Sequence, residues 1–273
     1  MIDNVWKDGL VRRFGAAAQS YEKQAEVQQK TAIFLSNLIK QHLDRKVPIR
    51  ILEIGCGTGY LTRALYDLYS DVNQEIQWHV TDISEDMLKQ CQSSIPAENN
   101  CGITGHKNII FSVMDGENPD FEGPFDLICS NMAFQWFRDL EGSLHKLTQL
   151  LSPQGLMAFT SLASDTFDLW HRCQKELSID RMAPEFPPAV FYTDSLAGLT
   201  VELEKKLFVQ RHNNGLEFLR NLREIGAHSR DLGRNPLGVG ELRSLLKNYE
   251  SYFTDGVVEA DYDVVFVLCS KNE

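Results

Sequence analysis

The sequence predicts an α/β fold built on a doubly wound, mostly parallel sheet. Two observations carry that prediction. From residue 49 to residue 162, short apolar runs alternate with segments of helical spacing, a rhythm typical of parallel strands joined by crossover helices. The first apolar run then breaks into three closely spaced glycines, where such sheets bind a ligand. At 273 residues and 43% hydrophobic content, the chain has the size and apolar content of one elaborated globular domain.

The first predicted element is helical. Residues 9–43 contain no proline and are rich in Ala, Gln, Glu and Lys. Five apolar runs bounded by turn residues then predict strands at 49–55, 76–83, 108–115, 125–132 and 155–162. Between them, helical spacing predicts helices at 58–69, 84–92 and 140–151, the second of them with Ser84 as its N-cap. The turn "SPQG" is expected to precede the fifth strand.

After residue 162 the regular alternation ends. We expect a helix at 165–178, a proline-rich segment at 183–191, a strand at 205–212, a helix at 216–227 and a closing strand at 262–270. No internal repeat is present. We therefore expect a single domain over residues 1–273 in three parts, namely an N-terminal helical lid at 1–48, a cofactor-binding half at 49–162, and substrate-side insertions with closing strands at 163–273.

Composition argues against several classes of protein. A formal net charge of −11 disfavours a general nucleic-acid binder, which needs cations against phosphate. The opening residues hold no apolar core long enough for a signal peptide, and no run approaches a membrane span, so we expect a cytoplasmic protein. Six cysteines lie without CxxC pairing and seven histidines without metal-ligand spacing, so we expect mostly reduced thiols and no metal site.

The three glycines Gly55, Gly57 and Gly59 stand in the stretch "EIGCGTG", with Glu53 two residues ahead of the first. Glycine adopts positive φ without strain and lets a ligand approach the backbone with no Cβ in the way. The helix that follows directs its N-terminal amides to the same place. The alternative interpretation is a tight strand-to-helix turn that binds nothing.

Two acidic residues end neighbouring predicted strands, Asp82 the second strand and Asp115 the third. A carboxylate at such a position can accept two hydrogen bonds from adjacent hydroxyl groups. Each residue also has a structural alternative, because Asp82 could cap the next helix and "DGENP" is good turn chemistry.

The stretch "EIGCGTG" resembles the first motif of class I S-adenosylmethionine-dependent methyltransferases, which have a Rossmann-like sheet. The resemblance implies S-adenosylmethionine as cofactor and S-adenosylhomocysteine as product. It places the methionine part against the glycines, the ribose hydroxyls on Asp82 and the adenine at Asp115. The cofactor-binding residues that it implies are Gln28, Glu53, Gly55, Gly57, Gly59, Asp82, Ile83, Met87, Asp115, Gly116 and Asn131.

Three further segments narrow the resemblance. "FGAAAQSYEKQAEVQ", "SNMAFQWFRDL" and "EFLRNLREIGAHSRDLGRNP" together resemble the malonyl-acyl-carrier-protein O-methyltransferases of biotin synthesis, the BioC family, over nearly the whole chain. Gln154 and Gln149 depart from it, standing where that family usually has a glycine and an arginine. The resemblance implies methylation of the free carboxylate of a malonyl group on acyl carrier protein (or coenzyme A), which primes pimelate and biotin synthesis.

The acceptor chemistry favours neutral hydrogen-bond donors. A carboxylate is already ionised at neutral pH, so the reaction needs no general base. A bidentate arginine would hold the carboxylate but lower its nucleophilicity, so we expect Tyr21, Gln135 and Trp136 to serve as the acceptor-side residues. Packing roles stay open for Tyr21 and Trp136. Phe14 is expected to anchor a lid that the N-terminal helix and residues 165–234 form over the cofactor.

The implied partner is an acidic carrier, although the enzyme itself is acidic. Attraction must then be local, and residues 205–234 hold seven basic residues against three acidic ones. A solvated face is the alternative. The docking candidates are Lys205, Lys206, Arg220 and Arg223, or Arg12 and Arg13.

Other functions stay open from the sequence. A trans-aconitate-type carboxyl methyltransferase would share a related "QW" segment, and a quinone or sterol C-methyltransferase would share the glycine motif. A non-catalytic scaffold would have no reason to keep Glu53, the three glycines and Asp82. A nicotinamide oxidoreductase is disfavoured by the GxGxG spacing and by the lack of an evident Tyr-x-x-x-Lys pair.

Overall fold

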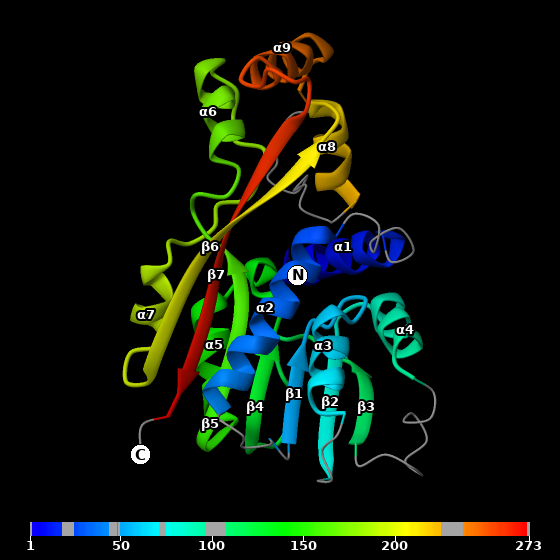
Figure 1. Ribbon diagram of the computed structural model, residues 1–273, viewed down its shortest axis with the longest axis vertical. Coiled ribbons are helices and arrows are strands. Elements are labelled where there is room, and N and C mark those ends of the chain that lie inside the picture. The colour runs from blue at the N-terminus through cyan, green and yellow to red at the C-terminus, as the bar shows by residue number, and fades with distance from the viewer. Residues whose placement is uncertain are drawn as a thin grey trace.

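The structure is a computed structural model that describes residues 2–17, 25–43, 48, 50–70, 75–96, 107–224 and 237–271. Within these residues, a seven-stranded sheet has the order β3-β2-β1-β4-β5-β7-β6, and β7 alone runs antiparallel to its neighbours (Figure 1). The prediction of a doubly wound, mostly parallel sheet is confirmed. The strands are β1 (Arg50–Ile54), β2 (Ile76–Asp82), β3 (Lys107–Val113), β4 (Phe125–Ser130), β5 (Leu151–Leu162), β6 (Thr200–His212) and β7 (Val258–Ser270).

Helices cover both faces of the sheet. They are α1 (Ile2–Ala17), α2 (Glu26–Leu43), α3 (Tyr60–Leu68), α4 (Glu85–Ser94), α5 (Leu140–Gln149), α6 (Asp168–Glu176), α7 (Val190–Ser195), α8 (Gly215–Glu224), α9 (Val239–Glu250) and the 3-10 turn η3 (Phe134–Trp136). In β1, Ile51 packs into the apolar layer of α2 and α3, whereas Leu52 and Ile54 pack with α5 and α7. Strands buried on both faces explain the continuous apolar runs of the sequence.

The sheet positions a binding site because its strand order reverses between β1 and β4. Helices that leave these two strands cover opposite faces, so a crevice opens beyond their carboxyl ends. The helix α1 lies across this end of the sheet, and α2 descends from it along one face (Figure 1).

Most predicted elements are confirmed, with three differences. The helical stretch 9–43 forms two helices, α1 and α2. The "SPQG" turn lies inside β5, where Leu151 pairs with Phe125 and Leu156 with Leu127, so the extra residues bulge out at Gln154 with φ of 68°. Helices α7 and α9 were not predicted, although the apolar residues of α9 follow a helical spacing. Ser84 is the N-cap of α4 as predicted, because its Oγ accepts a hydrogen bond from the Met87 N–H.

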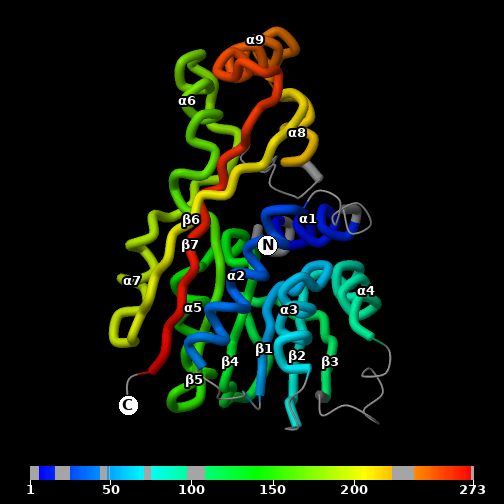
Figure 2. The backbone as a smooth tube through the Cα atoms, viewed as in Figure 1, coloured from blue at the N-terminus to red at the C-terminus, as the bar shows by residue number. Residues whose placement is uncertain are grey.

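The antiparallel pair of strands β6 and β7 carries a separate cluster of helices away from the main sheet. Strand β7 pairs with β5 only over residues 264–270, while its pairing with β6 continues to residue 258. Residues 207–212 and 258–263 therefore extend beyond the other strands, and α6, α8 and α9 lie around them (Figure 2). We call this unit the arm. Its interior is aromatic, and the rings buried there are Phe167, Trp170, Phe218, Tyr249 and Tyr262.

In the described part of the chain, no helix combines the length and apolar character that crossing a membrane requires.

Candidate active site

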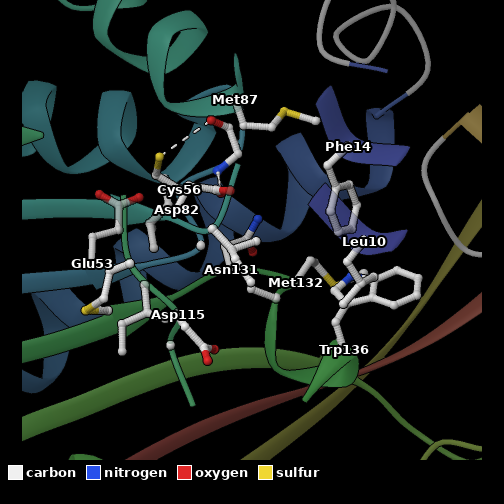
Figure 3. Close-up of a pocket in the computed structure, with 18 of the residues that line it drawn as sticks. Leu10, Phe14, Glu53, Cys56, Asp82, Met87, Asp115, Asn131, Met132 and Trp136 are labelled. Atoms are coloured by element: carbon white, nitrogen blue, oxygen red, sulfur yellow. Dashed lines mark hydrogen bonds between the residues drawn. The ribbon is translucent and has the colours of Figure 1, made fainter. Parts of the chain in front are cut away.

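A pocket lies at the carboxyl ends of the parallel strands, with about 930 Å³ of empty space that includes its open mouth. Residues of α1, the start of α2, the glycine turn, the ends of β2 and β3, and residues 131–133 and 136–137 line it. Figure 3 shows a polar side with Glu53, Cys56 and Asp82, an apolar side with Phe14 and Trp136, and Asn131 and Met132 between them. The pocket can therefore hold a ligand with one polar and one apolar end.

The three glycines of the turn have different structural reasons. All three have positive φ, at 66° for Gly55, 56° for Gly57 and 92° for Gly59. A Cβ on Gly57 would meet no atom within 4 Å, so its backbone faces open space in the pocket. A Cβ on Gly59 would lie 2.8 Å from the Cys91 Sγ, so this glycine permits α4 to pack closely. Only the first two line the pocket.

Asp82 is buried at the pocket wall and is held by backbone donors. Its Oδ2 accepts from the Gly57 N–H at 2.9 Å and its Oδ1 from the Ser84 N–H at 2.8 Å. Burial raises the pKa of Asp82 to about 6, although these donors work in the opposite direction. Each carboxylate oxygen keeps a second lone pair, so the group can still accept hydrogen bonds from a ligand. Ile83 and Met87 line the wall beside it.

Glu53 is a buried carboxyl group with one oxygen unsatisfied. Its Oε1 accepts from the Thr62 hydroxyl at 2.9 Å, while its Oε2 has no hydrogen-bond partner within the described structure. Burial raises the pKa of Glu53 to about 8. A cation bound beside it would restore its ionised form, because an opposite charge close by favours the carboxylate.

An ion-pair cluster ties α1 to the loop after β3. The Lys7 ammonium lies 2.5 Å from the Asp115 Oδ2 and 3.0 Å from the Glu117 Oε2. Partial burial opposes ionisation of Asp115, but hydrogen bonds from Lys7 and Asn118 hold its pKa below the ordinary value. The Oε1 of Glu117 also accepts from the backbone N–H groups of Arg138 and Asp139. This cluster closes the end of the pocket beside Gly116.

The segment after β4 forms the floor between the two sides of the pocket. The Asn131 side-chain amide donates to the backbone carbonyl of Gln28 at 2.9 Å and so joins the end of β4 to α2. The Phe14 ring meets Trp136 edge-on, with 5.6 Å between centroids. This contact closes the apolar side of the pocket, and the role of Phe14 as a lid anchor stays a prediction.

Most of the predicted site residues come together in this pocket. Those that line it are Gln28, Glu53, Gly55, Gly57, Asp82, Ile83, Met87, Asp115, Gly116, Asn131 and Trp136. Gly59 and Gln135 do not line it, and the Gln135 Nε2 donates instead to the Met132 carbonyl at 2.7 Å. Tyr21 lies outside the described residues. No described residue of the segment 165–234 lines the pocket, so its role as a lid stays a prediction.

Several lining residues were not predicted. They are Lys7, Leu10, Ile54, Cys56, Thr58, Tyr60, Leu61, Met114, Glu117, Met132, Ala133 and Phe137. Cys56 and Thr58 could have been predicted, because they lie between the glycines of the turn in the sequence. The α1 residues Lys7 and Leu10 carry no local signal, because only the tertiary fold brings that helix over the sheet.

Among the described residues of the predicted basic segment, the two lysines proposed for docking have acidic neighbours. Lys205 pairs with Asp263 at 3.0 Å and Asp165 at 3.3 Å. Lys206 lies over the Phe34 ring at 3.4 Å and near Glu204. The exposed Arg12 and Arg220, by contrast, have no ion pair within the described structure. The Arg13 guanidinium lies over the Trp6 ring at 5.3 Å, and nothing is described of the Arg223 side chain.

Over the residues that the structure describes, no group of three or more His, Cys, Asp or Glu side chains is placed to hold a metal ion.

Sequence similarity extends over nearly the whole chain. A family model described as a methyltransferase domain matches residues 51–155. The chain is 34% identical over 244 residues to the malonyl-[acyl-carrier protein] O-methyltransferase of Magnetococcus marinus. This alignment covers 88% of the chain and 85% of that relative. The chain is 38% identical over 245 residues to the biotin biosynthesis bifunctional protein BioCD of Bordetella avium. That match covers 88% of this chain but only 48% of that protein, so the chain spans about half of its length.

Solved structures share the fold at low sequence identity. The YcgJ protein from Bacillus subtilis has a TM-score of 0.59 at 14% identity, over 88% of this chain and 99% of that chain. The plantazolicin methyltransferase BamL, solved with a triazolic desmethylPZN analog and SAH, has a TM-score of 0.54 at 14% identity over 100% of both chains. At these identities the likeness shows the fold alone.

Proposed function

The chain belongs to the malonyl-[acyl-carrier protein] O-methyltransferase family, and we propose that it methylates the free carboxylate of a malonyl group borne by acyl carrier protein. The methyl donor is S-adenosylmethionine, and S-adenosylhomocysteine is the product. The proposal is supported above all by sequence identity. The chain is 34% identical to a malonyl-[acyl-carrier protein] O-methyltransferase, and the alignment covers 85% of that relative. The resulting ester masks the malonyl charge so that chain elongation toward pimelate and biotin can proceed.

The pocket fits this cofactor. The unpartnered Glu53 Oε2 suits the ammonium of the methionine part, and the open face of Gly57 suits close approach of its backbone. Asp82 suits the ribose hydroxyls, and Asp115 lies where the adenine is expected. When bound, the cofactor supplies an electrophilic methyl group on a sulfonium. The protein residues bind and orient it.

The acceptor side needs orientation and a dry surface more than acid–base chemistry. The attacking carboxylate is ionised at neutral pH, so no residue has to remove a proton. The anion and the sulfonium neutralise each other during transfer, which a low-polarity site favours. Phe14, Met132 and Trp136 give the pocket an apolar side. Tyr21, Gln135 and Trp136 remain the proposed acceptor-side residues.

The charge of the pocket supports a carrier-borne substrate over a free polycarboxylic acid. Among the described lining residues, Lys7 is the only cation, and it is already paired with Asp115 and Glu117. A trans-aconitate-type acceptor would need further cations for its remaining carboxylates. A malonyl thioester presents a single carboxylate and needs none.

For docking of the acidic carrier we propose Arg220 on the arm and Arg12 on α1, which are exposed and have no ion pair with any residue that the structure describes. Lys205 and Lys206 are weaker candidates because acidic neighbours already neutralise them. An Arg220→Glu variant should raise the KM for the malonyl carrier and leave S-adenosylhomocysteine affinity unchanged. Lys40→Glu, with the same charge change at the end of α2 distant from Gln28, is the matched control. An unchanged KM for Arg220→Glu would move the docking surface elsewhere.

The function is tested by methyl transfer from radiolabelled S-adenosylmethionine to four acceptors: malonyl-acyl carrier protein, malonyl-coenzyme A, free malonate and trans-aconitate. Base-labile label that is strongest on the malonyl carrier is expected, because a carboxyl methyl ester hydrolyses in base. Label on trans-aconitate alone would favour the alternative carboxyl methyltransferase. Bound cofactor with no transfer to any acceptor would contradict the proposed function.

A further inference from the structure

The hydroxyl of Thr160 connects two pocket residues although Thr160 itself does not line the pocket. Thr160 lies in β5 and is fully buried. Its Oγ1 donates to the Asn131 Oδ1 at 2.9 Å and accepts from the Met132 N–H at 2.9 Å. A hydroxyl has one donor and two acceptor sites, so both contacts form together. Thr160 therefore holds the chain just after β4 at two consecutive residues.

The backbone held in this way is strained. Met132 has a φ of 56°, a backbone conformation that residues with a Cβ rarely adopt. Two contacts stabilise it, the Thr160 hydroxyl at its N–H and the Gln135 amide at its carbonyl. Met132 is part of the pocket wall. Strain that surrounding contacts maintain at a pocket edge is typical of a preorganised site.

The same hydroxyl fixes which way the Asn131 amide faces. The amide oxygen accepts from Thr160, and the amide nitrogen donates to the Gln28 carbonyl. The reverse orientation would bring the amide oxygen against the Gln28 carbonyl, so that two acceptors would repel. An amide nitrogen carries two N–H groups, and the Gln28 carbonyl uses one. Asn131 lines the pocket between its polar and apolar sides, so the second N–H is available to a ligand there (Figure 3).

We infer that Thr160 is a positioning residue for methyl transfer, which orients the second Asn131 N–H toward a ligand carboxylate oxygen and maintains the strained turn at Met132. The inference rests on the proposed function for the identity of that carboxylate. Two carboxylates qualify, the one on the methionine part of the cofactor and the one on the malonyl group. A neutral amide suits either, because it orients the oxygen without neutralising the charge.

The test is Thr160→Val, which keeps the side-chain shape and removes both hydrogen bonds. Affinity for S-adenosylhomocysteine is measured by calorimetry, and kcat and KM with malonyl-acyl carrier protein by label transfer. We expect a loss on the order of tenfold in one of the two, as for one or two hydrogen bonds. Weaker S-adenosylhomocysteine binding would assign the cofactor carboxylate, and a lower kcat/KM with unchanged binding would assign the malonyl carboxylate. Thr160→Ser, which keeps the hydroxyl, should restore the wild-type value.

Thr166→Val is the matched control. Thr166 is equally buried, and its hydroxyl also donates one hydrogen bond and accepts one, both with the Asp263 backbone. It should lower the melting temperature as much as Thr160→Val but leave binding and turnover unchanged. Asn131→Asp keeps the oxygen that Thr160 contacts and removes both N–H groups, so it should reproduce the Thr160→Val defect.

Equal binding and turnover for Thr160→Val and Thr166→Val would overturn the inference, as would wild-type behaviour of Asn131→Asp. Failure of the proposed function has a different signature. In that case the wild-type enzyme would not label the malonyl carrier, whereas Thr160→Val would still weaken S-adenosylhomocysteine binding.

Discussion

Around the pocket, buried polar side chains accept or donate hydrogen bonds, whereas the interior of the arm is a cluster of aromatic rings that mostly meet edge to face. Asp82 accepts hydrogen bonds from two backbone N–H groups, and one buried oxygen of Glu53 has no partner among the described residues. In the arm, Trp170 meets Phe218 and Tyr249 edge-on, with 5.4 Å and 5.1 Å between centroids. Buried polar groups cost stability unless they are satisfied, while buried rings contribute to it.

The two regions therefore differ in what their buried side chains stabilise, a ligand in the pocket and the fold in the arm. The pocket keeps buried polar groups that a ligand satisfies, so changes there should alter ligand affinity more than folding. The interior of the arm consists mainly of its own aromatic rings packed against each other, so changes there should alter folding more than affinity. Four substitutions test this separation, and they are taken in order of decreasing expected effect.

Removing the central ring of the arm should have the largest effect. Trp170→Ala leaves a cavity among buried aromatic side chains and should lower the free energy of unfolding by about 3–5 kcal/mol. Thermal unfolding measures this loss, and Leu177→Ala, at a partly exposed position at the end of α6, is the control with a small effect. S-adenosylhomocysteine affinity, measured well below the melting temperature, should stay at the wild-type value. A parallel loss of affinity would show that the arm and the pocket are one cooperative unit.

A side chain on the glycine turn should affect the pocket instead. Gly57→Ala places a methyl group in the open space of the pocket and forces a residue with a Cβ into positive φ, which costs about 1–2 kcal/mol. Gly198 also has positive φ and open space around its missing Cβ, but it lies in the turn before β6. Both Gly57→Ala and Gly198→Ala should lower stability, and Gly57→Ala alone should weaken S-adenosylhomocysteine binding. Equal affinities in the two variants would mean that no ligand approaches Gly57.

These two glycines also show what sequence could and could not predict. The parallel strands and the glycine turn have local signals, namely apolar runs and residue spacing, so the sheet and the polar side of the pocket were predictable. The separate reasons for Gly57 and Gly59 were not, because one faces open space and the other faces Cys91 of α4. Likewise, the basic segment looked available because Asp263, which neutralises Lys205, lies far along the chain on β7. The role of each glycine and the availability of each basic side chain depend on contacts between distant segments, which residue spacing alone does not predict.

The titration of Glu53 gives a prediction that links affinity to pH. Its pKa is about 8 in the ligand-free fold against an ordinary value of 4.5, so the folded state holds the proton longer than the unfolded state. Relative to the unfolded chain, the fold is therefore most stable with Glu53 protonated. This contribution to the free energy of unfolding is lost as pH rises from about 4.5 to about 8. A ligand ammonium prefers the ionised form, so S-adenosylhomocysteine binding should strengthen roughly tenfold from about pH 6.5 to about pH 7.5.

Glu53→Gln is the control for this pH dependence of S-adenosylhomocysteine affinity. The amide has nearly the same shape and does not titrate, so the variant should bind weakly and its affinity should change little over that range. Calorimetry in two buffers with different ionisation enthalpies would detect the proton that the wild-type protein releases on binding. An identical pH dependence in both proteins would show that another group controls it, and Asp82, with a pKa of about 6, would be the next candidate.

The smallest effect is expected at the ion pairs that hold α1 over the pocket. Lys7→Met keeps the length of the side chain and removes its contacts with Asp115 and Glu117, which link α1 to the loop after β3. Because these groups are partly exposed, the pairs contribute little, and S-adenosylhomocysteine should dissociate roughly two- to fivefold faster. Lys30→Met removes an exposed pair with Glu26 on α2 and should leave the dissociation rate unchanged. Stopped-flow displacement measures both rates. If the Lys7→Met and Lys30→Met rates are equal, α1 covers the pocket through its apolar residues. In that case the polar contacts that distinguish the pocket from the arm are those of the loops after the strands, and they do not include α1.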